Sequence, residues 1–195
     1  MAPHAALIAA GQEPELVLVE RDGDRVDPPG YVELNPMGVV PTLVHDGLVL
    51  TEAAAIVGYV ADTWPQARLA PARGTRERVR FDELLAFMST TPQQTLLRLI
   101  YPERYTTDAD ASGVRAAAGT ALERQFGWLA TLVSEQRCLL GDEPGGADLY
   151  LHMLIRWGRH LDPDTRTRDG LGPFYRRLTA HSAVAGMLEA QGIEA

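Results

Sequence analysis

The pattern of apolar residues along the chain changes at residues 65–75, Pro-Gln-Ala-Arg-Leu-Ala-Pro-Ala-Arg-Gly-Thr. This change limits the folds that the chain can adopt. The stretch holds two prolines and a glycine without hydrophobic periodicity, which is typical of a linker. Before it, short apolar runs and turn residues predict both strands and helices. After it, apolar residues recur at helical spacing, which predicts helices only. We therefore expect an α+β protein with a small mixed domain over residues 1–66 and an all-α domain over residues 74–195.

Local patterns predict the individual elements. Residues 16–19, Leu-Val-Leu-Val, form a short apolar run that predicts a buried strand. Asp46 and Gly47, between two apolar runs, predict the turn of a β-hairpin. Glu52 then opens a helix that Pro65 ends. Further helices are expected over residues 3–10, 76–99 (broken at Pro92), 114–133, 147–161, 172–181 and 183–191.

Composition excludes several classes of function. The 195 residues include 26 acidic and 18 basic side chains, for a net charge of −8, so we expect no broad binding to nucleic acid. No apolar run approaches the roughly 18 residues of a membrane span, and no secretory signal opens the chain, so we expect a soluble cytoplasmic protein. Every basic residue is Arg, which excludes Schiff-base catalysis by lysine. With one cysteine, Cys138, and no Cys/His cluster of zinc spacing, we expect neither a disulfide nor a metal.

Two motifs give the chain a family resemblance. Residues 35–43, Asn-Pro-Met-Gly-Val-Val-Pro-Thr-Leu, and residues 50–62, Leu-Thr-Glu-Ala-Ala-Ala-Ile-Val-Gly-Tyr-Val-Ala-Asp, closely resemble the N-terminal domain of glutathione transferases. Residues 140–142, Leu-Gly-Asp, 147–150, Ala-Asp-Leu-Tyr, and 156–157, Arg-Trp, continue the match. The similarity runs nearly end to end and is closest to the bacterial beta class. It implies a thioredoxin-like N-terminal domain, an all-α C-terminal domain and a homodimer.

The resemblance implies a glutathione site on the first two motifs. The Val40–Pro41 bond is expected to be cis, which turns the backbone N–H and C=O of Val40 toward a peptide such as the cysteinyl part of glutathione. Glu52 and Ala53 stand at the start of a helix whose free N–H groups favour the γ-glutamyl carboxylate. We therefore expect glutathione, or another low-molecular-weight thiol, at Val40, Pro41, Glu52 and Ala53. The alternative is that these residues only hold the hairpin and cap the helix.

Several positions depart from the beta-class pattern. In that class a strand and a loop with the catalytic Cys or Ser precede a Pro-His pair, which here is Pro3 and His4. We therefore expect the thioredoxin-like domain to lack its usual first strand, which would lie centrally beside residues 16–19. A wrongly assigned start codon, a true truncation with repacking and a strand supplied by another chain all remain open. The histidine of the first long helix in that class aligns here with Gln93, and Ala53 takes the place of a hydroxyl residue.

Polar side chains around Pro92 supply the remaining candidates. In the family this stretch lines the substrate side of the inter-domain cleft, and here it carries hydroxyl, amide and guanidinium donors. The alternative is a solvated helix face at a proline kink. We expect Cys138 to be a buried core residue rather than a nucleophile. The candidate catalytic residues are His4, Gln93 and Tyr101, and the candidate substrate-cleft residues are Thr90, Gln94, Arg98 and Tyr105.

Three functions fit this sequence. The first is a glutathione S-transferase-like enzyme that acts on a small hydrophobic substrate. The second is a thiol-independent isomerase, lyase or cyclase of a biosynthetic pathway that uses the inter-domain cleft. The third is a non-catalytic binding module on the same fold. Because a fold does not fix a function, the sequence leaves all three open.

Overall fold

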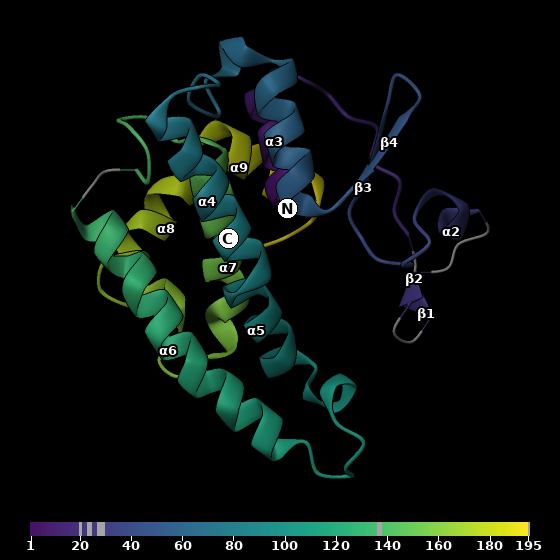
Figure 1. Cartoon of the computed structure of the whole chain (residues 1–195), viewed down its shortest axis with the longest axis vertical. Helices are drawn as coiled ribbons and strands as arrows, with labels where there is room; N and C mark the ends of the chain where they lie inside the picture. The colour runs from purple at the N-terminus through teal and green to yellow at the C-terminus, as the bar shows by residue number, and fades with distance from the viewer. Residues whose placement is uncertain (20, 23–24, 27–29, 136–137, 195) are drawn as a thin grey trace.

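A computed structural model describes residues 1–19, 21–22, 25–26, 30–135 and 138–194 of the chain (Figure 1). Its helices and strands are α1 (Ala2–Ala9), β1 (Arg21–Asp22), β2 (Arg25–Val26), α2 (Tyr31–Leu34), β3 (Thr42–His45), β4 (Leu48–Thr51), α3 (Ala53–Thr63), α4 (Arg76–Thr90), α5 (Pro92–Ile100), α6 (Ser112–Glu135), α7 (Gly146–Trp157), α8 (Leu171–Thr179) and α9 (Ser182–Ala190). Short 3₁₀ helices are η1 (Pro65–Ala67), η2 (Pro102–Tyr105), η3 (Gly158–His160) and η4 (Thr165–Thr167). The expected helices and the hairpin are thereby confirmed, and Pro92 separates α4 from α5.

Helix α7 forms the centre of the molecule. Every residue from Gly146 to Ile155 is buried, as expected for a helix that is apolar on most faces. Helices α1, α3, α4, α5 and α8 all contact it, and α6 packs along α5 on the outside (Figure 1). The hydrophobic core therefore surrounds one helix, and the position of that helix determines where its neighbours lie.

A buried carboxylate fixes the start of α7. Asp148 accepts hydrogen bonds from the backbone N–H groups of Leu139, at 2.7 Å, and Gly145, at 2.9 Å. Burial nevertheless raises the pKa of Asp148 to about 6. The N–H of Gly146 donates to the carbonyl of Leu69 at 2.7 Å, which ties the segment before α4 to the first turn of α7.

A buried arginine joins α3 to α4. The guanidinium of Arg78 donates to both carboxylate oxygens of Asp62, at 2.6 and 3.1 Å, and to Asp82 at 2.9 Å. The hydrogen bond from Arg78 is the main reason that the pKa of Asp62 lies below its ordinary value. A planar guanidinium with several carboxylate partners holds the two helices in one relative orientation.

The N-terminal third contains little sheet. Strands β3 and β4 pair antiparallel around Asp46 and Gly47, both with positive φ, while β1 pairs with β2 in a separate ladder. The prediction of a buried strand at residues 16–19 is wrong, because these residues pair with no strand in the described part of the chain. Leu18 is 89% exposed, because an apolar run becomes a buried strand only where a second strand pairs with it.

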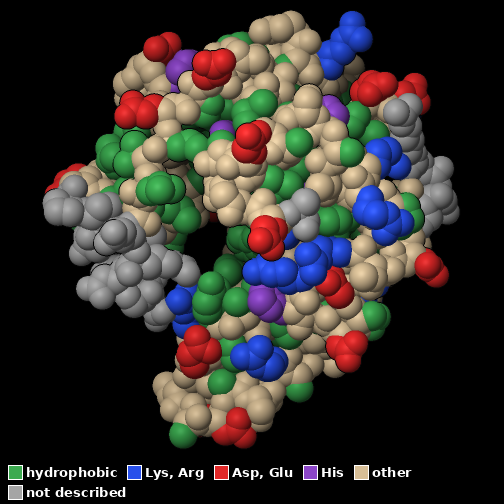
Figure 2. All heavy atoms as spheres, turned by 180° about the vertical axis from the view of Figure 1, so that it is seen from behind, with side chains coloured by type: hydrophobic (Ala, Val, Ile, Leu, Met, Phe, Trp, Pro, Cys, Tyr) green, Lys and Arg blue, Asp and Glu red, His purple; other side chains and the backbone are tan. Residues whose placement is uncertain are grey.

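Hydrophobic exposure is concentrated in the same third. The hairpin and the α2 region project to one side of the helical body (Figure 1), and hydrophobic side chains border part of an opening in the face seen in Figure 2. The exposed large hydrophobic residues are Leu16, Val17, Leu18, Leu34, Met37, Val39, Val40, Val44, Leu48, Val49, Val79 and Tyr105. All but the last two lie within residues 16–49. No described helix is both long and apolar enough to cross a membrane.

A buried leucine and an exposed leucine test which parts of the chain contribute to the hydrophobic core. Leu154 in α7 is completely buried, so Leu154→Ala should lower the free energy of unfolding by about 2–5 kcal/mol. Leu18→Ala should change it by less than about 0.5 kcal/mol, because the side chain is already in water. Chemical denaturation of both variants measures the two values. A loss at Leu18 that matches the loss at Leu154 would show that residues 16–19 are buried after all.

A buried histidine makes stability depend on pH. His152 stacks on Tyr175 at 4.6 Å, its Nε2 lies 3.0 Å from the hydroxyl of Thr179, and burial lowers its pKa to about 4. The unfolded chain binds a proton at this residue near pH 6.5, whereas the folded chain does so only near pH 4. Stability is therefore lost as the pH falls through this window, by up to about 3 kcal/mol.

The variant His152→Gln isolates this effect, because every other group titrates in both proteins. The difference in unfolding free energy between the wild type and the variant should decrease by about 3 kcal/mol from pH 7 to pH 4. Urea denaturation at several pH values gives this difference. Parallel pH profiles of the two proteins would contradict the assignment.

Candidate functional site

Side chains from α2 hold the loop that leads into β3. The hydroxyl of Tyr31 donates to the carbonyl of Val39 at 2.7 Å and lies 2.9 Å from the hydroxyl of Thr42. The buried amide of Asn35 donates to the same carbonyl at 2.6 Å and accepts from the N–H of Met37 at 3.1 Å. The only asparagine in the chain therefore fixes the shape of this loop.

The loop presents the backbone of Val40. The Val40–Pro41 bond is cis, as the family resemblance implies, and Val40 is 55% exposed. Within the described residues, no hydrogen bond is found for the backbone N–H or C=O of Val40. Both groups are thus available to pair with an extended peptide.

The start of α3 lies beside this turn. In the β3–β4 ladder Thr42 is opposite Thr51, so the next residue on each side brings Pro41 next to Glu52. Glu52 is exposed, has φ of 68° and makes no side-chain cap to the helix. A positive φ at a non-glycine residue is uncommon and is often found at ligand sites. Ala53 follows as the first helical residue, where the N–H groups of the first turn favour an anion.

A tyrosine of the central helix brings a second group to this region. The hydroxyl of buried Tyr150 donates to Oε1 of Gln93, in the first turn of α5. Burial, and then the negative charge of Glu52, hold the pKa of Tyr150 well above its ordinary value. The first turns of α3 and α5 therefore both approach Tyr150. The sequence pattern around Tyr150 does not point to a site residue, because Tyr150 stands in an apolar helix and its partner is 57 positions away.

The other candidates lie along α5, on η2, which follows it, and at Tyr101 between them. The carbonyl of Gln94 accepts a hydrogen bond from Arg98 at 2.9 Å. The guanidinium of Arg98 lies 4.9 Å from the ring centre of Tyr105, and that of Arg104 lies 4.0 Å from the ring centre of Tyr101. Cation–π contacts therefore join two tyrosine rings to guanidinium groups in this part of the chain.

Two predicted site residues make contacts elsewhere. His4 is buried where α1 packs on α9, its Nδ1 lies 2.9 Å from the side-chain nitrogen of Gln191, and burial lowers its pKa. The hydroxyl of Thr90 donates to the carbonyl of Ala86 at 2.8 Å, within its own helix. The structure therefore brings together Glu52, Gln93 and Tyr150, and it gives His4 and Thr90 other partners.

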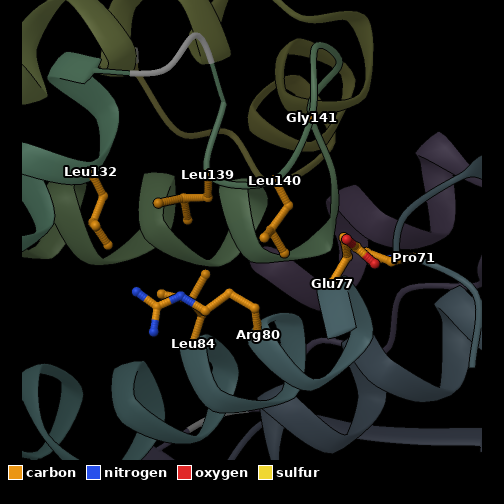
Figure 3. A pocket seen from close by; sticks show the side chains of 8 residues that line it. All are labelled: Pro71, Glu77, Arg80, Leu84, Leu132, Leu139, Leu140 and Gly141. Atoms are coloured by element: carbon orange, nitrogen blue, oxygen red, sulfur yellow. The ribbon is translucent and has the colours of Figure 1, made fainter. Parts of the chain in front are cut away.

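The larger of the two described cavities lies away from these residues. It has a volume of about 340 Å³, and Figure 3 shows Arg80 and Leu84 of α4 opposite the leucines that precede α7. It is lined by Pro71, Glu77, Arg80, Leu84, Leu132, Leu139, Leu140 and Gly141. None of the predicted site residues lines it or the second cavity, of about 230 Å³. We place the candidate site at Val40, Glu52 and Gln93, because the unpaired backbone of Val40 lies beside the start of α3, while Glu52 and Gln93 both interact with Tyr150.

In the part of the chain that the structure describes, no three side chains of His, Cys, Asp or Glu gather where they could hold a metal ion.

Known proteins with similar sequences include glutathione S-transferases. Residues 1–62 match the family model for the glutathione S-transferase N-terminal domain. Glutathione S-transferase GST-4.5 of Xanthomonas campestris pv. campestris is 32% identical over 180 residues, which cover 92% of this chain and 87% of that protein. A maleylacetoacetate isomerase of Pseudomonas aeruginosa is 31% identical over 156 residues, which cover 76% of this chain and 72% of that protein.

Solved structures agree with this result. A ternary complex of BphK, a bacterial GST, superposes with a TM-score of 0.87 at 34% identity, over 98% of this chain and 94% of that one. The beta-class glutathione S-transferase of Sphingomonas chungbukensis gives 0.85 at 31% identity, over 99% and 94%. A sphingomonad glutathione S-transferase complexed with glutathione gives 0.86 at 29% identity, with the same coverage. The fold is thus a thioredoxin-like N-terminal domain with few strands followed by a helical domain.

The state of the single thiol can be checked directly. Cys138 is fully buried, as the sequence predicts, and its sulfur lies 3.8 Å from the carbonyl of Asp142. An aromatic disulfide reagent should therefore react with the native protein at least about tenfold more slowly than with the denatured protein, because reaction requires local opening. Release of the reagent's chromophore measures both rates. Equal rates would mean that Cys138 is an accessible, reactive thiol.

Proposed function

This chain belongs to the glutathione S-transferase family, and from that premise we propose that it binds glutathione and uses the thiol on a small hydrophobic electrophile. The observation that carries the proposal is the position of the unpaired Val40 backbone beside the first turn of α3. One element offers a peptide-binding edge and the other offers an anion site. Glutathione is a peptide with a carboxylate at the required end.

Two of the three residues of glutathione, the cysteinyl and the γ-glutamyl, have partners in this arrangement. The cysteinyl backbone pairs with the N–H and C=O of Val40, as a short strand added to an edge. The γ-glutamyl carboxylate accepts hydrogen bonds from the first turn of α3 at Ala53, and its ammonium pairs with the carboxylate of Glu52. The sphingomonad relative, described as complexed with glutathione, supports this choice of ligand.

The reaction that we propose is a substitution or addition at sulfur. The thiol of glutathione loses its proton to solvent, and the thiolate attacks an electrophilic carbon of the substrate. A carbon–sulfur bond forms, and either a leaving group departs with its bonding electrons or a π bond of the substrate takes up the charge and then a proton. In this proposal the first turn of α5 faces the sulfur, while Arg98 and Tyr101 face the substrate.

A second candidate function is isomerisation. The Pseudomonas aeruginosa relative is named as a maleylacetoacetate isomerase, and here Arg98 of α5 and Arg104 of η2 bring positive charge to one region, which would suit a substrate with carboxylates. Turnover of maleylacetoacetate in the presence of glutathione would favour this function over transfer. Binding of glutathione without turnover of either substrate type would favour a binding module.

Assembly, domain boundaries and location belong to the same proposal. We expect a homodimer with domains over residues 1–66 and 74–195, and we expect it in the cytoplasm. Light scattering coupled to size-exclusion chromatography tests the dimer, which should give twice the mass of one chain. A monomer would contradict this part of the proposal without affecting glutathione binding.

Calorimetric titration with glutathione tests the main proposal. We expect a dissociation constant in the micromolar to millimolar range for the wild type. Glu52→Gln should weaken binding by about tenfold or more, because a charge-assisted hydrogen bond to the ammonium is lost. Undetectable binding at millimolar glutathione would overturn the proposal.

Glu33→Gln is the matched control. Glu33 is an exposed carboxylate of α2 in the same part of the chain, and its removal makes the same change in net charge. Its titration should match that of the wild type. If both variants weaken binding equally, the effect is one of overall charge, and Glu52 does not contact the ligand.

A further inference from the structure

We propose that Tyr150 is a positioning residue for the thiol: its hydroxyl holds the amide of Gln93 so that the amide N–H donates to the sulfur of bound glutathione. The inference rests on the proposed function, since it names the group that acts on the sulfur. Gln93 is then the residue that touches the ligand, and Tyr150 acts through it.

The geometry of one hydrogen bond fixes the amide. Tyr150 is almost completely buried in α7, and its hydroxyl donates to Oε1 of Gln93. An amide group is planar and carries its oxygen and nitrogen on opposite sides, so an occupied Oε1 leaves Nε2 as the free end. Gln93 is partly exposed, and the described residues provide no hydrogen-bond partner for Nε2. Its two N–H groups are therefore available to a ligand.

Tyr150 has a buried O–H that needs an acceptor, and Oε1 of Gln93 is the acceptor that it contacts. Burial and the nearby charge of Glu52 keep the phenol protonated well beyond its ordinary range. A phenolate would attract Nε2 instead and would turn the amide around. The neutral hydroxyl thus keeps its proton for donation to Oε1, which favours the amide orientation seen here, and a phenol that stays protonated does not act as the base that removes the thiol proton.

The position of Gln93 suits a developing negative charge. It lies in the first turn of α5, where the helix dipole favours anions. Acceptance of a hydrogen bond at Oε1 also polarises the amide and strengthens its N–H donors. A donor aimed at sulfur stabilises the thiolate relative to the thiol, which lowers the pKa of the thiol. The Tyr150–Gln93 pair thereby supplies the activation that a helix terminus alone would give only in part.

The test measures the pKa of bound glutathione from the ultraviolet absorption of the thiolate. Gln93→Ala should raise this pKa by about one unit, so that about tenfold less thiolate forms at neutral pH. Tyr150→Phe should give a large part of the same shift. The double variant should show no more than Gln93→Ala alone, because Tyr150 acts through Gln93. Additive shifts would overturn the inference, as would a shift for Gln93→Ala with none for Tyr150→Phe.

A second readout does not depend on glutathione. In the ligand-free protein, the side-chain amide signal of Gln93 is identified in a nitrogen–proton correlation spectrum by its loss in Gln93→Ala. Tyr150→Phe should shift this signal toward the position of a solvent-exposed glutamine. An unchanged signal would overturn the inference. If the wild type binds no glutathione, the proposed function fails, while this spectrum still decides whether Tyr150 positions Gln93.

Tyr59→Phe is the matched control. The hydroxyl of Tyr59 lies 2.7 Å from Nδ1 of His45, so this variant also loses one side-chain hydrogen bond, but away from Gln93. It should leave the Gln93 signal and the pKa of the thiol unchanged. Denaturation of Tyr150→Phe and Tyr59→Phe shows whether both remain folded. Equal effects of the two variants on the thiol would mean that Tyr150 has only a structural role.

Discussion

The buried carboxylate of Asp148 is the contact on which the rest of the structure depends. It accepts the backbone N–H groups of Leu139 and Gly145, and so it fixes both the segment that enters α7 and the first turn of that helix. Helices α1, α3, α4, α5 and α8 pack directly on α7. In a close-packed interior a central helix cannot shift without moving its neighbours. Asp148 therefore determines the position of α7, and α7 determines the positions of the surrounding helices.

The same helix supports the candidate site. Tyr150 stands two residues after Asp148, and its hydroxyl donates a hydrogen bond to Gln93 on α5. The negative charge of Glu52, at the start of α3, helps to raise the pKa of Tyr150. The contact that fixes the start of α7 thus also fixes how the first turns of α3 and α5 approach each other. Stability and site geometry share one origin here. Loss of activity on substitution of Asp148 would accordingly reflect a displaced helix and would not identify a catalytic group.

Local features of this chain can be predicted from its sequence, and long-range ones cannot. Helical periodicity and the hairpin turn depend on neighbouring residues, as does the motif that carries Val40 and Glu52, so their geometry follows from the sequence. The strand expected at residues 16–19 is wrong because burial of an apolar run depends on a partner elsewhere, and no described strand pairs with it. The role of Tyr150 at the site cannot be predicted from the sequence for a related reason. Its apolar neighbours favour a core role, and its contact with Gln93 comes from tertiary packing.

The two halves of the candidate site have different kinds of support. The turn at Val40 is held by hydrogen bonds from Tyr31 and Asn35 and by one hairpin, in a region that exposes most of its large hydrophobic side chains. Gln93 and Tyr150, in contrast, belong to the helical core. Regions with few buried contacts open at a lower free energy than the core. A ligand that pairs with Val40 and also reaches Gln93 would bind only the folded form of both parts, and it would therefore stabilise the weaker part.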